Sequence, residues 1–68
     1  MNREEAEYAA KNLVGGKIFH TKKGCKGIIS GVVKVQVNGI WTETLSYKIG
    51  DETFSRFYDD CINLVCLP

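Results

Sequence analysis

The residues best suited to chemistry are one histidine and three cysteines, because imidazole and thiolate groups bind metals and act as nucleophiles. His20 and Cys25 lie in a short basic loop, and Cys61 and Cys66 lie near the other end with the same spacing. Structural zinc sites often use three Cys and one His, supplied as two close pairs separated by a long segment. The sequence therefore predicts a structural zinc site formed by His20, Cys25, Cys61 and Cys66.

The size of the chain also favours zinc, although two alternatives stay open. A structural zinc contributes on the order of 10 kcal/mol to folding, whereas so small a core supplies only a few. The lysines around Cys25 would offset the negative charge of three thiolates. Free cysteines, however, are often buried as small hydrophobic residues. The other alternative is a Cys61–Cys66 disulfide that leaves Cys25 free.

The same residues do not make a complete catalytic set. A nucleophilic cysteine would need His20 as its base and a third group to orient the base. The adjacent acids Asp59 and Asp60 are typical of a solvated turn or a backbone cap. The sequence has no phosphate-binding loop, dinucleotide fingerprint or helical HExxH pattern. We therefore expect the protein not to be an enzyme.

Length and composition predict a single domain, residues 1–68, of the globular class. The hydrophobic fraction is 44%, which is ordinary for a folded protein. No apolar run approaches the roughly 18 residues that cross a membrane, and the first residues lack the features of a signal peptide. We expect a cytoplasmic protein with reduced thiols and no membrane partner, acting in the host cytosol if a phage encodes it.

Charge is distributed unevenly along the chain, although the formal net charge is only +1. Residues 11–34 contain lysines and no acidic residue, whereas acidic residues predominate in residues 1–10 and 35–68. Such polarity can steer partners of opposite charge toward each region, and it is also compatible with an ordinary solvated surface.

The first element is predicted to be a helix over residues 2–14. Asn2 is a favourable N-cap, and Glu5 stands at the position that completes a capping box. Apolar residues recur at helical spacing and form one narrow stripe. Gly15 and Gly16 should end the helix, because glycine readily adopts the left-handed conformation of a C-terminal cap.

The rest of the chain is predicted to form short strands joined by turns. Gly31 interrupts a β-branched stretch and marks a bend or bulge. Asn38-Gly39 is a strong signal for a two-residue hairpin turn, which needs positive φ at both residues. A short helical turn is expected at residues 59–61. The predicted strands cover residues 17–21, 28–37, 40–49, 53–58 and 64–67.

Three segments, residues 16–20, 24–33 and 57–64, together resemble small barrels of the Tudor, KOW and Src-homology-3 kind. The resemblance implies an α+β, mostly β fold: an N-terminal helix, residues 1–15, then a small five-stranded antiparallel, strongly bent SH3-like barrel, residues 16–68. In such barrels the first long loop lies beside the helical turn that precedes the last strand, which would bring the zinc ligands together. An OB-like barrel is the alternative, for which the chain is short.

The small size, single domain and incomplete catalytic set predict a binding protein. In these respects the chain resembles the small phage-encoded proteins that block host defence nucleases, the anti-CRISPR class among them. The resemblance implies an inhibitor that covers a functional surface of a larger protein or nucleoprotein, such as an RNA-guided CRISPR nuclease. Exposed aromatic and charged residues would make the contacts, the acidic ones against a basic nucleic-acid channel. These residues are Trp41, Glu43, Asp51, Glu52, Arg56, Tyr58, Asp59 and Asp60, with Tyr47, Phe54 and Phe57 divided between core and surface.

The alternative function is nucleic-acid binding through the basic stretch, residues 17–34. Lysine ammonium groups would hold phosphates, and exposed aromatic rings would stack on bases. The low net charge argues against this function, because dedicated nucleic-acid binders are usually far more basic. The lysines concerned are Lys17, Lys22, Lys23, Lys26 and Lys34.

Overall fold

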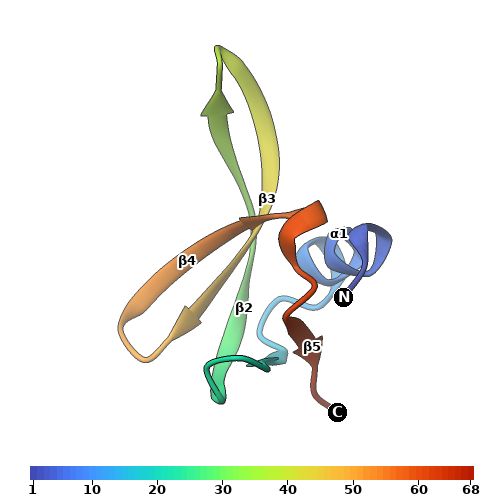
Figure 1. Ribbon diagram of the computed structural model, residues 1–68, viewed down its shortest axis with the longest axis vertical. Helices are drawn as coiled ribbons and strands as arrows, with labels where there is room; N and C mark the ends of the chain where they lie inside the picture. Colours follow the sequence, from blue (N-terminus) through green and yellow to red (C-terminus); the bar gives the residue numbers. More distant parts are fainter.

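The computed structural model describes residues 1–68 and consists of one helix packed on a five-stranded antiparallel sheet (Figure 1). The α+β, mostly β class predicted from the sequence is confirmed. No helix has the length and apolar character needed to cross a membrane. The elements are α1 (Arg3–Asn12), β1 (Lys17–His20), β2 (Cys25–Val37), β3 (Ile40–Ile49), β4 (Glu52–Phe57), the 3₁₀ helix η1 (Tyr58–Asp60) and β5 (Leu64–Cys66).

Helix α1 begins with the predicted capping box. The Asn2 side chain accepts a hydrogen bond from the Glu5 backbone N–H at 2.8 Å, and the Glu5 carboxylate accepts one from the Asn2 N–H at 2.9 Å. Its buried face consists of Ala6, Ala9 and Ala10. Because alanine side chains are small, the helix axis can approach the sheet closely, and the helix is stabilised mainly by this packing.

The sheet has the strand order β4-β3-β2-β1-β5, so β4 and β5 form its two edges. The expected closed barrel is therefore not confirmed, and the sheet is open. Closure would require the two edge strands to pair with each other. The chain instead leaves β4 through η1, and β5, which has only three residues, pairs with β1 as its single strand neighbour.

The predicted bend in β2 is confirmed at Gly31. The register between β2 and β3 shifts between Ile29 and Gly31, as in a β-bulge. Gly31 has φ +127°, and a Cβ added there would lie 3.5 Å from Cγ2 of Val14. The bulge therefore lets the segment that follows α1 lie against the bent strand.

The core lies between α1, η1 and one face of the sheet. Tyr47 stacks on Phe54 with ring centroids 5.4 Å apart. The backbone nitrogen of Met1 donates hydrogen bonds to the carbonyls of Cys61 (2.9 Å) and Leu64 (2.6 Å), which joins the residues before α1 to the end of η1 and to the start of β5. The buried cluster consists of Ala6, Ala9, Ala10, Ile18, Ile29, Leu45, Tyr47, Tyr58, Cys61 and Leu64.

The far ends of β2 and β3 form a two-stranded hairpin, at the top of Figure 1, that extends beyond the helix and the core. We call residues 33–43 the hairpin arm. Asn38 and Gly39 have φ values of 50° and 81°, which confirms the predicted turn with positive φ at both central residues. Ile40 and Trp41, directly after the turn, are 69% and 66% exposed.

Candidate functional site

The four residues predicted as zinc ligands do not come together, and the prediction of a structural zinc site is wrong. No group of three or more His, Cys, Asp or Glu side chains is placed to hold a metal ion. All three cysteines are free, so a Cys61–Cys66 disulfide is also absent. His20 and Cys25 face each other across β1 and β2, whereas Cys61 is buried in the core and Cys66 is exposed on β5.

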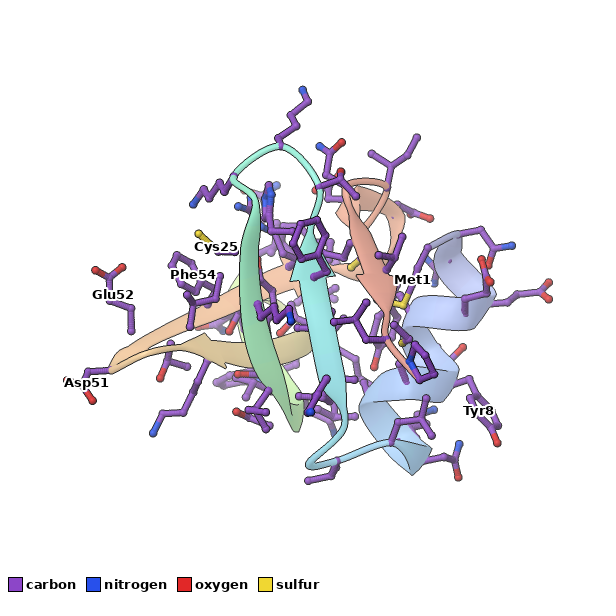
Figure 2. The ribbon with its side chains drawn as sticks, turned by 90° about the horizontal axis from the view of Figure 1, so that it is seen from below. Met1, Tyr8, Cys25, Asp51, Glu52 and Phe54 are labelled. Atoms are coloured by element: carbon purple, nitrogen blue, oxygen red, sulfur yellow. The ribbon has the colours of Figure 1, made fainter.

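The strand order explains why these ligands stay apart. Cys66 pairs with Ile18 on β1, and Cys25 lies on β2, on the other side of β1. Two strand spacings amount to about 10 Å between backbones, whereas ligands of one zinc ion bind it at about 2.3 Å. Figure 2 shows Cys25 beside β2, far from Met1, whose sulfur lies 3.6 Å from that of Cys66.

Each thiol has a local environment that does not involve a metal. The Cys25 thiol donates to the Lys23 carbonyl at 3.4 Å, and His20 Nδ1 accepts from the Lys23 N–H at 3.2 Å. The Cys61 thiol donates to the Phe57 carbonyl at 3.3 Å. Burial raises the pKa of the Cys61 thiol to about 11, so this cysteine stays protonated and behaves as a core residue.

The residues predicted to contact a partner lie in three different settings. Asp51 and Glu52 are exposed at the tip of the β3–β4 hairpin, at the edge of the molecule (Figure 2). Arg56 is half-buried, and its Nε donates to the Tyr47 hydroxyl at 3.4 Å, so it supports the core. Tyr58 is buried. The remaining four are Trp41, Glu43, Asp59 and Asp60, of which the first three, with Tyr58, line one groove.

This groove, which we call the Trp41 groove, runs between α1, the base of the hairpin arm and η1. It is shallow, with a volume of about 380 Å³. Its lining combines three aromatic rings, a type of side chain enriched at protein-binding surfaces, with three carboxylates and one arginine. The lining residues are Arg3, Glu7, Trp41, Thr42, Glu43, Phe57, Tyr58 and Asp59.

A network of polar contacts holds the carboxylates of the Trp41 groove in place. Glu43 accepts a hydrogen bond from the Tyr58 hydroxyl at 3.1 Å, and its carboxylate lies 3.6 Å from the Lys11 ammonium. Lys11 also pairs with Glu7 at 2.7 Å, one helical turn away. Burial, together with the hydrogen bond to Glu43, raises the pKa of Tyr58 to about 12. Tyr58 therefore remains a neutral donor that positions the Glu43 carboxylate.

An exposed apolar strip lies on the face of the hairpin arm opposite to Trp41, because Val37 and Ile40 alternate along their strands with Gln36 and its partner Trp41. Val33 and Phe57 flank the buried Thr44 in one row across β2, β3 and β4. Val37 and Ile40 pair with each other next to the turn, and both are exposed. Contiguous apolar surface of this kind commonly marks an interaction site.

The lysines of the predicted nucleic-acid site form no ion pair. The only cationic side chains in ion pairs are those of Arg3 and Lys11. Lys34 lies on the hairpin arm, apart from the other four: Lys22 and Lys23 lie in the β1–β2 turn, Lys26 lies near the start of β2, and Lys17 lies at the other end of β1. Lys48, on β3, joins the group and was missed, although the alternation of residues 40–49 places it on the outer face. The lysines outside the hairpin arm, on β1, β2, β3 and the β1–β2 turn, are Lys17, Lys22, Lys23, Lys26 and Lys48.

Sequence reasoning also missed Arg3, Glu7 and Thr42, which line the Trp41 groove, and Lys11, which pairs with Glu7 and Glu43 beside it. Glu7 and Lys11 stand one helical turn apart, a spacing that predicts an ion pair but not its place beside the hairpin arm.

Searches of protein-family models, curated proteins and solved structures found no match to this chain. A proposal for the function of this protein therefore has to be argued from the geometry and the charge of its residues.

Proposed function

We propose that this protein is a small binding protein that inhibits a larger protein or nucleoprotein by covering a basic functional surface. The proposed target is an RNA-guided CRISPR nuclease of the host cell. The observation that carries the proposal is the Trp41 groove, in which an indole that is 66% exposed stands beside fixed carboxylates. No catalysis by the chain is required.

The charge of the groove favours a basic partner. Its lining contains three carboxylates, on Glu7, Glu43 and Asp59. Arg3 pairs with Asp59, and Lys11 pairs with both Glu7 and Glu43, so three carboxylates share two cations and the cluster keeps one excess negative charge. An arginine or lysine of the partner can pair with a carboxylate and place its charge over the face of Trp41. Such a cation–π contact contributes about 0.5–1 kcal/mol at an exposed site and ~2 kcal/mol or more when water is excluded. The channels that hold nucleic acid in RNA-guided nucleases are positively charged.

The hairpin arm provides the apolar part of the interface. Tryptophan is enriched among the residues that dominate binding energy, particularly when neighbouring contacts exclude water. Phe57, which lines the groove with Trp41, can supply one of those neighbouring contacts, and Val33, Val37 and Ile40 give the opposite face of the arm an apolar surface of its own. Because the arm extends beyond the helix and core, it can enter a concave surface that the rest of the molecule cannot reach.

The proposed fold family and location accord with this function. We propose that the sheet is an open relative of the Src-homology-3 kind of barrel. The strand order β4-β3-β2-β1-β5, the bulge at Gly31 and the 3₁₀ helix before the last strand support this proposal. A phage-encoded inhibitor of a host nuclease would act in the host cytosol, where its thiols would stay reduced.

A cleavage assay tests the proposed function. Purified CRISPR nucleases of different types are loaded with guide RNA and mixed with the protein before target DNA is added. We expect at least one nuclease to be inhibited. Trp41→Ala should raise the concentration needed for half-inhibition by about 30-fold, which corresponds to the loss of about 2 kcal/mol typical of a dominant contact.

Tyr8→Ala is the matched control, because Tyr8 is another exposed aromatic residue, on α1 and outside the Trp41 groove. This variant should inhibit as well as the wild-type protein. The proposal fails if no nuclease is inhibited, or if the two variants lose inhibition equally.

A further inference from the structure

A second surface, distinct from the Trp41 groove, lies on the sheet where β1, β2 and β3 run side by side. Lys17 pairs with Ile28, and Ile28 pairs with Lys48, so the three residues form one row across three strands. Neighbouring strands are about 4.8 Å apart, which places the two lysine backbones about 10 Å apart with Ile28 between them. Lys26 lies on the same face, two residues before Ile28.

These side chains surround a shallow groove that we call the lysine groove. The bare backbone of two glycines forms part of its floor, and Ile28 is 45% exposed within it. Phe19 pairs with Lys26 and so belongs to the same face, where it is half-buried. The lining residues are Lys17, Lys26, Gly27, Ile28, Lys48 and Gly50.

The charge of the lysine groove is not neutralised within the molecule. None of its lysines lies within ion-pair distance of a carboxylate, and its lining contains no acidic residue. The nearest acidic residues in sequence, Asp51 and Glu52, follow Gly50 in the β3–β4 turn. Glu52 pairs with Ile49, and the side chains of Ile49 and Lys48 point to opposite faces of the sheet. Glu52 therefore lies on the face opposite to the lysine groove.

We propose that the lysine groove binds single-stranded nucleic acid. Three unpaired ammonium groups match the repeated phosphates of a nucleic-acid backbone, and binding would release their condensed counterions. Ile28 and Phe19 offer apolar surface between these charges, on which unstacked bases can rest. A duplex would present only its phosphates to so small a surface, and would gain nothing from those two side chains. This activity goes beyond the proposed inhibition and uses a separate face.

The salt dependence of binding gives the proposal a magnitude. Each phosphate contact to a single strand contributes about −0.7 to the slope of log affinity against log salt concentration. Three contacts predict a slope of about −2.1, so the affinity should fall about 18-fold between about 50 and 200 mM salt. The electrostatic contribution of one contact is taken as zero at 1 M salt, so the loss of that contact should weaken binding about eightfold at about 50 mM salt.

Fluorescence anisotropy with labelled oligo(dT) and oligo(U), each about 15 nucleotides long, tests the proposal. Lys48→Gln should weaken binding about eightfold and reduce the salt slope by about 0.7. Lys34→Gln is the matched control, because it removes the same charge from an exposed, unpaired lysine on the hairpin arm. It should leave the affinity within about twofold. Thermal unfolding of both variants establishes that they fold.

Three results would overturn the proposal. The first is no binding of either oligonucleotide at about 50 mM salt. The second is an equal loss of affinity in Lys48→Gln and Lys34→Gln, which would indicate net charge and not a site. The third is equal or tighter binding of a duplex of the same length or of a poly-glutamate peptide, because neither offers unstacked bases to Ile28 and Phe19.

Discussion

The buried thiol of Cys61 makes the stability of this protein sensitive to alkaline pH. Burial raises its pKa from the ordinary value of 9.0 to about 11. The folded state therefore binds the proton more tightly than the unfolded state does. The resulting stability is fully present below about pH 9 and is lost as the pH rises through about 11. We predict that Cys61→Ala removes this part of the pH dependence.

The magnitude follows from the two pKa values. At about pH 10 a thiol of pKa near 9 is about ten parts ionised to one part protonated, whereas the folded thiol is still mostly protonated. The difference is about tenfold in the unfolding equilibrium, or about 1.4 kcal/mol between pH 8 and pH 10. Tyr58, whose pKa is raised to about 12, contributes less at pH 10 and contributes equally in both proteins.

Urea unfolding at about pH 8, 9 and 10 measures the effect. The wild-type free energy of unfolding should fall by about 1.4 kcal/mol more than that of Cys61→Ala over this range. Cys66→Ala, which removes an exposed thiol, should follow the wild-type curve. The reasoning is refuted if Cys61→Ala loses stability with pH as steeply as the wild type, because the Cys61 thiol would then ionise as easily folded as unfolded.

Two further predictions concern the metal and the sheet. Treating the protein with EDTA should leave the thermal unfolding midpoint unchanged, since His20 and the cysteines do not share a site. A fall of the midpoint by about 5 °C or more would contradict this expectation, because it would show that a bound metal stabilises the fold. Gly27→Ala should destabilise the fold by about 1–3 kcal/mol, because its Cβ would lie 2.5 Å from the Lys48 carbonyl oxygen. Ser30→Ala on the exposed side of β2 is the control, and equal urea midpoints for the two variants would contradict this reasoning.

Local signals in the sequence predicted the elements well. The capping box of Asn2 and Glu5, the Asn38-Gly39 turn and the bulge at Gly31 each depend on residues close together in the chain. Backbone conformation at these positions is decided by side-chain caps and by the freedom of glycine. The same signals could not predict whether β4 and β5 would meet, because that depends on the path of the chain through η1.

For the candidate sites, the sequence identified suitable residue types but could not predict which of those residues lie close together. The matched spacing of His20/Cys25 and Cys61/Cys66 did not reveal that β1 separates Cys25 from Cys66. A buried cysteine and a zinc-binding cysteine look alike in one sequence. That Trp41 contacts a partner stays a prediction from residue type, and only the folded chain places it near the acidic side chains of α1 and η1.

The most direct test of the central claim follows the single tryptophan of the chain by ¹⁹F NMR, with fluorotryptophan in place of Trp41. A guide-loaded nuclease identified by inhibition in the cleavage assay is added in steps to the labelled protein. We expect the one resonance to shift and broaden in proportion to inhibition, because Trp41 would become buried against the nuclease. An unchanged resonance under conditions of full inhibition would contradict it, because Trp41 would then lie outside the interface.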